Sequence, residues 1–556
     1  MSGGAHVIKL DKPVTLSEAR VIAARLMRND PGVELAEPDR IKHPTATTPR
    51  DPDYASQWHY FAPAGANLDG ANLPNAWGVI KGTSIIVAVI DTGALLLHDD
   101  LIGQTVPGYD FITDLTSSND GDGRDADPTD PGDWVAANEC GPGSPASDSS
   151  WHGTHVSGTI AAAWNNMGGA GIAPDAKILP VRVLGKCGGY DSDIIDGMRW
   201  AAGIAVPGVP LNQNPAQVLN LSLAGTSGDP CTSIYQTAIN EIVGKGKVIV
   251  VAAGNDGLSN VSPPANCLGV IAVTAHAIDG DNAWYANIGP EVTLSAPGGG
   301  CGGSVSNCTD FTSANGPGIY LTMDTGKTVH STYSWSAHGW AGTSMAAPHV
   351  AGTVALMLSV NQLLTPAQVT SYLQSSARPH PAHTVCTSTD PNGVNANAGL
   401  CGAGLLDAAA ALAAISAVWP TVAITSPSQL VAAGATVTLS GSATAAPGRT
   451  ISSYSWTQLS GASVGTITNA TLPAASFTAP ATGTYSFKLT ATDDNSNSGS
   501  ATATAIVTVD SAPVLTSVPL TKTVTVGGTL NFVVTANDVD GGILVFDTTS
   551  LPLEQR

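Results

Sequence analysis

Three short segments of the chain carry the residue types of a nucleophilic catalyst. Asp91 ends the apolar run VAVID, His152 opens HGTHVSGTIA, and Ser344 lies in GTSMAAPHVAG. A serine hydroxyl is a weak nucleophile until an imidazole removes its proton, and the imidazole needs a carboxylate to set its tautomer. Together the three residues predict acyl transfer through a covalent intermediate on Ser344.

Glycines and expected helix starts accompany these residues. A glycine stands within two positions of each of the three, so a substrate backbone can approach closely. His152 and Ser344 each open a stretch whose composition predicts a helix. A helix that begins at Ser344 would point free N–H groups at the place where an oxyanion develops.

Six short β-branched runs between residues 84 and 298 must position these segments. They are apolar almost throughout and are separated by glycines and helical stretches, which favours a parallel sheet covered by helices on both faces. After Trp419 the helical periodicity ends and Ser, Thr, Ala and Val alternate, which is typical of β-sandwich modules. The six runs are SIIVAVID, KILPVRVL, QVLNLSL, KVIVVAAG, VIAVTA and VTLSAPG.

The order Asp, His, Ser, with separations of 61 and 192 residues, resembles the signature motifs of the subtilase family of secreted bacterial serine endopeptidases. The resemblance covers about residues 51–417. It implies an α/β fold, a three-layer subtilisin-like domain with a mostly parallel sheet between helices. It also implies that Asp91, His152 and Ser344 hydrolyse peptide bonds. Asn255 in VVAAGNDG is similar to the family's oxyanion asparagine, whose amide donates to the tetrahedral intermediate.

The same resemblance implies a primary specificity pocket with VLNLSLAG as one wall and SPPAN as its floor. Neither stretch is acidic, so we expect an apolar or broad preference rather than a trypsin-like one. Pro264 aligns with a family proline that follows a cis bond. His155 and His349 also lie in the motifs, where we expect structural roles for them. The expected substrate-binding residues are Ser222, Leu223, Ala224, Gly225, Ser262, Pro263, Pro264, Ala265 and Asn266.

The chain is acidic: 43 Asp and Glu face 22 Lys and Arg, a formal net charge of −21 over 556 residues. This excess argues against a basic patch for nucleic acid or anionic membranes. Residues 110–133 alone hold eight Asp and one Arg. Such a run must be solvated or neutralised, and calcium, which takes about six to eight oxygen ligands, would neutralise it.

Two calcium sites follow from the resemblance. Subtilases of the thermitase type hold calcium in the loop just before the catalytic histidine, and a merely solvated loop is the alternative here. In a second site, Asp100 follows Asp91 by nine residues, as does a ligand of the family's tight calcium site, and Asn166 and Asp51 fit two further ligands. The expected ligands in the loop are Asp120, Asp122, Asp125, Asp127 and Asp130.

Eight cysteines without a C-x-x-C pattern favour disulfides and an oxidising compartment. Pairing of sequence neighbours predicts the bonds 140–187, 231–267, 301–308 and 386–401. No apolar run approaches the roughly 18–20 residues of a membrane helix, and the longest, Ala408 to Trp419, indicates a core helix. The first residues lack the pattern of a signal peptide. We expect a secreted protein that binds neither nucleic acid nor membranes.

The chain divides into four predicted parts. Residues 1–50 resemble the second half of a subtilase propeptide with a linker, which implies an intramolecular inhibitor. Residues 51–419 are the expected peptidase domain. Residues 420–510 resemble a PKD β-sandwich through YSW and GTYSFKLTATDDNSNSG, and residues 511–556 resemble the opening of an Ig-like or cadherin-like module.

The sequence therefore predicts a monomeric, calcium-stabilised serine endopeptidase that acts on proteins and peptides. Two other functions stay open: a processing protease of narrow specificity, and a substrate-binding or adhesive protein whose peptidase domain is inert. The intact set of Asp91, His152 and Ser344 speaks against an inert domain, whereas nothing in the sequence decides the breadth of specificity.

Overall fold

The computed structural model describes residues 48–64, 69–303, 317–336, 340–382 and most of 384–510, together with 514–517 and 535–537. After residue 382 the gaps fall at 383, 388, 390–394, 396, 417, 427–428, 433, 447–448, 481–482 and 496. The predictions for the propeptide remnant before residue 48, for Cys308 and for nearly all of the last module lie outside the described residues.

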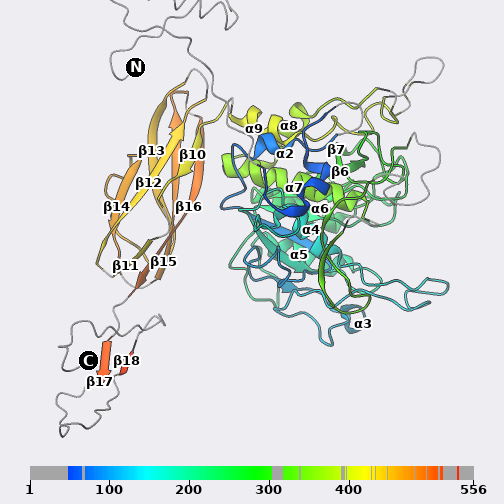
Figure 1. The fold of residues 1–556 in the computed structure, drawn as a ribbon, viewed down its shortest axis with the longest axis horizontal. Helices are drawn as coiled ribbons and strands as arrows, with labels where there is room; N and C mark the ends of the chain where they lie inside the picture. The colour runs from blue at the N-terminus through cyan, green and yellow to red at the C-terminus, as the bar shows by residue number, and fades with distance from the viewer. Residues whose placement is uncertain are drawn as a thin grey trace, which may run out of the picture. The chain divides into compact units, whose positions relative to one another are not determined.

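A seven-stranded parallel sheet lies at the centre of the first large domain, in the order β2-β3-β1-β4-β5-β6-β7. Its strands β6 and β7 are labelled in Figure 1. Six of its strands are the predicted runs. Strand β2, of only two residues, is too short to be recognised from the sequence. The bounds are β1 Ile86–Asp91, β2 Tyr109–Asp110, β3 Lys177–Arg182, β4 Val218–Leu221, β5 Val248–Ala252, β6 Ile271–His276 and β7 Val292–Pro297.

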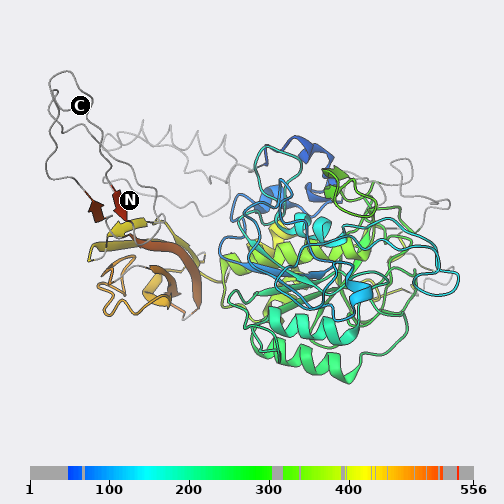
Figure 2. The same cartoon turned by 90° about the horizontal axis from the view of Figure 1, so that it is seen from below.

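Helices cover both faces of this sheet, and Figure 2 shows the sheet between them. In β1, Val87 and Val89 point into the core that contains α4 (His152–Ala161) and α7 (Thr343–Val360). The alternate residues Ala88 and Ile90 point into the core of α5 (Asp191–Ala201) and α6 (Ser233–Gly244). The predicted three-layer α/β fold is thus confirmed, and β1 shows why its strands are apolar on both faces.

Helix α7 is long and apolar enough to cross a membrane by length and composition, with a mean hydropathy of 1.3, yet 94% of it is buried inside the protein. It is the central helix of the domain, and it is a longer apolar element than the predicted Ala408–Trp419 helix. That segment forms α9 (Ala408–Ser416), whose buried residues include Leu412 and Ile415. The remaining elements are η1 Pro52–Ser56, η2 Trp58–Tyr60, α2 Leu73–Ala76, α3 Leu115–Ser118, α8 Pro366–Ser376 and the antiparallel pair β8 Leu321–Asp324 and β9 Tyr333–Ser336.

The second domain is a β-sandwich with sheets β10-β12-β14 and β11-β16-β15-β13. Alternating apolar residues of both sheets build its core, which includes Trp456, Phe477 and Tyr485. Beyond it, the structure describes one pair of short strands, β17 Val514–Ser517 and β18 Thr535–Asn537. The sandwich strands are β10 Thr421–Ile424, β11 Gln429–Ala432, β12 Thr436–Thr444, β13 Ile451–Ser460, β14 Ala474–Thr478, β15 Gly483–Asp493 and β16 Ser498–Asp510.

Three of the four predicted disulfides are present and therefore confirmed: Cys140–Cys187, Cys231–Cys267 and Cys386–Cys401. Cys301 is also disulfide-bonded, but its predicted partner Cys308 is not among the described residues. The three pairs are neighbours in sequence, so each closes a local loop of the first domain.

Candidate active site

Asp91 and His152 meet at the carboxyl edge of the sheet. Asp91 is the last residue of β1 and fully buried, and His152 is the first residue of α4. The imidazole Nδ1 lies 2.7 Å from the Asp91 carboxylate Oδ1, which also accepts the N–H of Thr92 at 2.8 Å. The bond leaves Nε2 of His152 as the ring atom available for proton transfer.

A close backbone approach holds the start of α4 against the end of β1. A side chain at Gly153 would place its Cβ 2.0 Å from the carbonyl oxygen of Gly93, so only glycine fits there. The Gly153 N–H donates to the hydroxyl of Thr92, which in turn donates to the buried carboxylate of Asp130 (3.0 and 2.7 Å). These contacts position His152 relative to Asp91. The sequence motif alone does not reveal that Asp130 holds the hydroxyl of Thr92.

Ser344 lies in the first turn of α7, whose N-cap is Gly342. Its hydroxyl donates to the carbonyl oxygen of Ser222 at 3.1 Å, while the Ser222 hydroxyl donates to the carbonyl oxygen of Ser344 at 2.7 Å. In this structure the Ser344 hydroxyl is therefore hydrogen-bonded to the backbone at Ser222.

Asn255 follows β5 and faces the same groove. Its side-chain oxygen accepts from the N–H and the hydroxyl of Thr343 at 2.8 and 2.9 Å. With the oxygen held in this way, the Nδ2 amino group is left to donate toward the groove. Thr343 is an orienting residue that was not predicted from the sequence, although it stands inside the GTS motif.

A groove of about 910 Å³ joins these residues, and it is lined by Ser344, His152 and Asn255. The predicted wall residues Ser222, Leu223, Ala224 and Gly225 line it, as do Pro263 and Pro264, whose peptide bond is cis as predicted. Gly225 N–H donates to the Pro263 carbonyl at 2.7 Å and joins the two walls. The groove lining does not include the other predicted residues, namely the buried Ser262 and Ala265, and Asn266, which donates to the Asp229 carbonyl.

The electrostatic surroundings distinguish His152 from His155 and His349. Burial acts to lower the pKa of His152, but the carboxylates of Asp91, Asp133 and Asp130 outweigh it and raise this pKa above its ordinary value. Burial lowers the pKa of His155 to about 3 and that of His349 to about 4, so both are neutral. His155 bonds the Ile319 carbonyl and His349 the Met345 carbonyl, which are structural contacts.

The predicted tight calcium site holds two buried carboxyls on either side of Asn165. Its N–H donates to Asp51 Oδ1 at 3.0 Å, and its side-chain amide donates to Asp100 Oδ1 at 3.1 Å. Asp51 Oδ2 is buried with no hydrogen-bond partner, and Trp335 donates to Asp100 Oδ2 at 2.6 Å. Burial raises the pKa of Asp100 to about 7, with Asp51 adding to the effect. Asn166 N–H also donates to Asp51 Oδ1, at 3.1 Å.

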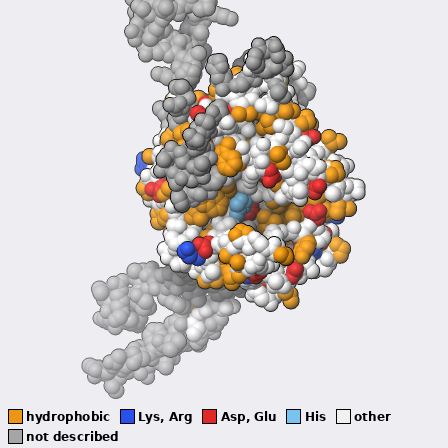
Figure 3. Space-filling model, turned by 90° about the vertical axis from the view of Figure 1, so that its right-hand side faces the viewer, with side chains coloured by type: hydrophobic (Ala, Val, Ile, Leu, Met, Phe, Trp, Pro, Cys, Tyr) orange, Lys and Arg blue, Asp and Glu red, His pale blue; other side chains and the backbone are white. Residues whose placement is uncertain are grey.

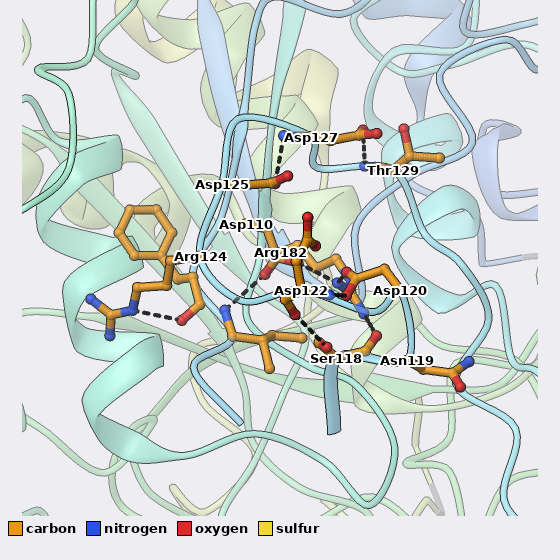
Figure 4. A network of polar contacts seen from close by, with 12 residues as sticks. Asp110, Ser118, Asn119, Asp120, Asp122, Arg124, Asp125, Asp127, Thr129 and Arg182 are labelled. Carbon is orange, nitrogen blue, oxygen red and sulfur yellow. Dashed lines mark hydrogen bonds and ion pairs between the residues drawn. The ribbon is translucent and has the colours of Figure 1, made fainter. Parts of the chain in front are cut away.

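Arg182 is the centre of the contacts in the acidic loop (Figure 4). It ends β3 beside Asp91 of β1 and is 1% exposed. Its guanidinium contacts the carboxylates of Asp110 and Asp120 and the carbonyl of Ser118. A protein cation thus lies where a metal was expected from the sequence to neutralise the loop.

The other predicted loop ligands serve mainly as acceptors for nearby N–H groups. Asp125 accepts from Asp127 N–H, and Asp127 accepts from Thr129 N–H, at 2.8 and 3.0 Å. Asp130 accepts from Gly132 N–H at 2.8 Å, and the carbonyl of Asp122 accepts from Ser118. Across the described part of the chain, no three His, Cys, Asp or Glu side chains converge to form a metal site. Calcium in this loop therefore stays a prediction.

Comparison with known proteins agrees with this geometry. Residues 82–404 match the sequence profile of the Subtilase family, and residues 426–509 match the profile of a PKD domain family. The chain is 44% identical over 415 residues to an extracellular protease of Xanthomonas campestris pv. campestris and 40% identical over 425 residues to an extracellular basic protease of Dichelobacter nodosus. Each alignment covers 74% of this chain, which spans only 64% and 63% of those two relatives.

A solved structure is also similar. A protease from Pseudoalteromonas arctica is 46% identical, with a TM-score of 0.58, and the match covers 66% of this chain and 99% of that one. This similarity agrees with the subtilisin-like fold of the first domain.

Arg182→Met should destabilise the first domain strongly. The substitution leaves the buried carboxylate of Asp110 without its cation, a change that costs about 3–5 kcal/mol. As a matched control, Arg199→Met breaks an ion pair with Glu241 whose side chains are 29% and 49% exposed, and it should cost about 1 kcal/mol or less. Thermal unfolding at one heating rate compares the two variants. Equal midpoints for both would contradict a stabilising role for the Arg182 network.

Proposed function

Because the chain belongs to the subtilase family, we propose that it is a secreted serine endopeptidase that cleaves proteins and peptides. The observation that supports this most is the Asp91–His152 hydrogen bond of 2.7 Å at one groove with Ser344 and Asn255. The word extracellular in the names of two relatives supports secretion.

In the proposed mechanism, neutral His152 takes the proton of the Ser344 hydroxyl as this attacks the peptide carbonyl. Asp91 stabilises the imidazolium that forms. The Asn255 amino group and the Ser344 N–H donate to the oxyanion in the tetrahedral intermediate. His152 then protonates the leaving amine. In the second half of the reaction, His152 takes a proton from water as the water attacks the acyl-enzyme, and it returns this proton to Ser344 as the product acid leaves.

We propose that the primary pocket accepts many kinds of substrate side chain and prefers apolar ones. The side chains of Leu223, Ala224 and Pro263 form its apolar surface, and Gly225 leaves space for a substrate chain. Burial of an apolar substrate side chain against this surface would contribute about 25 cal/mol per Å². The narrow processing protease is the alternative, and a substrate-binding protein with an inert domain is the rival from another class.

The flanking parts complete the proposal. Residues 1–50 act as a propeptide that inhibits the peptidase domain of residues 51–419 until it is cleaved, and the mature enzyme is a monomer. Residues 420–510 act as a PKD-like spacer or substrate-binding module, and the profile match over residues 426–509 supports this assignment. Residues 511–556 begin a further module.

We also propose that calcium stabilises the folded enzyme at the site of Asp51 and Asp100. Because both carboxyls are buried and Asp51 Oδ2 has no hydrogen-bond partner, a cation at this site would compensate their charge. Calcium prefers oxygen ligands of this kind. Asn166 is the expected amide ligand. When bound, calcium would supply positive charge to these carboxyls, would take no part in peptide hydrolysis and would stabilise only the folded chain.

A serine-directed fluorophosphonate tests the enzyme proposal. The wild type should hydrolyse casein and should be labelled at Ser344, because only an activated serine reacts. Ser344→Ala should lose both the labelling and the hydrolysis while it keeps its fold by circular dichroism. Labelling elsewhere, or no hydrolysis by the wild type after removal of residues 1–50, would favour the inert-domain alternative. Cleavage of casein at only one or two bonds would favour the processing protease.

Chelation tests the metal proposal. The Ser344→Ala protein should have a higher unfolding midpoint in calcium than in a chelator. At a calcium concentration of about 100 times Kd, the free energy of unfolding should be about 2.7 kcal/mol greater. Asp51→Asn should remove this difference, whereas the matched Asp125→Asn in the acidic loop should keep it. The opposite result would place the ion in the loop, and an unchanged midpoint of the Ser344→Ala protein itself would refute calcium binding.

A further inference from the structure

Trp151, the residue before His152, holds a backbone conformation that bulky residues avoid. Its φ and ψ angles are 53° and 30°, in the left-handed region that glycine and asparagine enter far more readily than tryptophan. Trp151 is the N-cap of α4, and its carbonyl oxygen accepts the N–H of His155 at 3.2 Å. The backbone turn at Trp151 therefore sets where α4 begins, and with it the place of His152.

The indole of Trp151 offsets this conformational cost through burial and one hydrogen bond. The side chain is 0% exposed and is the largest fully buried one among the described residues. Its Nε1–H donates to the carbonyl oxygen of Gly326 at 2.7 Å. Strained backbone conformations persist only where the surrounding structure holds them, and they gather at functional sites. In this turn the indole and its carbonyl partner hold the strained residue in place.

Gly326 lies in the turn between β8 and β9, and this turn binds the segment before His152 at further points. Ser149 donates its N–H to the carbonyl oxygen of Lys327 and its hydroxyl to that of Thr328, each at 2.7 Å. Together with the indole bond, three hydrogen bonds to successive carbonyl oxygens of the turn fix the segment that leads into α4.

Asp324, the last residue of β8, shapes this turn. Its carboxylate Oδ1 accepts the N–H groups of Gly326 and Ser331 at 2.7 and 2.8 Å, and its Oδ2 lies 2.7 Å from His330 Nδ1. A Cβ on Gly326 would lie 1.9 Å from the carbonyl oxygen of Val329, so only glycine fits there. The carbonyl group of Gly326 is therefore held in the direction that receives the indole.

These contacts reach His152 without forming any of the substrate surface. The residues that line the groove include Ser150 and His152 but not Trp151. The His152 side chain is 20% exposed, and Figure 3 shows a histidine exposed within a hollow of the surface. Because His152 Nδ1 lies only 2.7 Å from the Asp91 carboxylate, a small shift at the start of α4 would lengthen this hydrogen bond.

We propose that Trp151 is a positioning residue for the acyl transfer: its indole fastens the strained turn before His152 to the β8–β9 turn, so that the imidazole keeps its place beside Asp91. This inference rests on the proposed peptidase function and adds a residue that touches neither the substrate nor the reacting atoms. The sequence alone predicted no role for Trp151, because its partner Gly326 is 175 residues away in the chain.

Trp151→Phe, which keeps an aromatic ring but loses the donor, tests the proposal. A misplacement of about 1 Å can cost about 10²-fold in rate, so a partial loosening should lower kcat about tenfold and leave KM nearly unchanged. Burial lowers the pKa of His152, whereas Asp91, Asp133 and Asp130 raise it. A weaker Asp91 contact should therefore lower this pKa and move the acid limb of the kcat/KM profile to lower pH. Rates are taken per serine labelled by the fluorophosphonate, so unfolded protein does not contribute.

Trp77→Phe is the matched control. Trp77 is 2% exposed, and its indole also donates to a backbone carbonyl, that of Ile172, at 2.7 Å. It does not line the groove. Trp77→Phe should lower the unfolding midpoint and leave kcat and the pH profile as in the wild type.

Asp324→Ala tests the other side of the contact. Without the carboxylate, the carbonyl group of Gly326 loses its fixed direction, so kcat should fall about tenfold again. Because both changes break one contact, the double variant with Trp151→Phe should lose about tenfold, not the about hundredfold of independent effects. Lys327→Met, which removes an exposed ion pair with Asp148 from the same turn, should leave the kinetics unchanged.

The outcomes separate this inference from the proposed function. Wild-type kcat and pH profile in Trp151→Phe would overturn the positioning role. An equal fall of kcat in Trp77→Phe would overturn it as well, since general destabilisation would then explain the loss. Losses that multiply in the double variant would overturn the link to the β8–β9 turn. If the wild type neither hydrolyses casein nor is labelled at Ser344, the proposed function itself fails.

Discussion

The hydrogen bond between Asp91 and His152 depends on a junction at the carboxyl edge of the parallel sheet. Asp91 ends a buried strand, and His152 begins a helix 61 residues later. Because the carboxyl ends of parallel strands lie on one edge, the loops that follow β1 and β5 and the starts of α4 and α7 meet there. The small residues at this edge, Gly153 above all, let the backbones approach closely enough for the 2.7 Å contact.

Lys and Arg are fewer than Asp and Glu in this chain, so the position of each buried cation matters for stability. Arg182 lies in the interior at the end of β3 and binds the acidic loop to the sheet. The buried pair Asp51 and Asp100 forms no ion pair with a Lys or Arg among the described residues, and this is the physical reason for which calcium is proposed there.

Much of the fold could be predicted, because apolar β-branched runs define buried strands directly. The six predicted strands, the helix start at His152 and three local disulfides all depend on residues close together in sequence. The contacts of Arg182 and the orienting bond from Thr343 to Asn255 depend on residues that meet only in the folded chain. The acidic loop illustrates the difference: its charge was evident from the sequence, but its internal cation comes from β3.

We propose that the buried carboxylate of Asp91 makes His152 an effective base for Ser344. Asp91→Asn keeps the size of the side chain but stabilises the wrong tautomer of the ring, so kcat should fall by about 10⁴ with a nearly unchanged KM and unfolding midpoint. Steady-state kinetics of this variant on one peptide substrate measures the effect. A kcat within about tenfold of the wild type, in a protein that is folded normally, would contradict this role of Asp91.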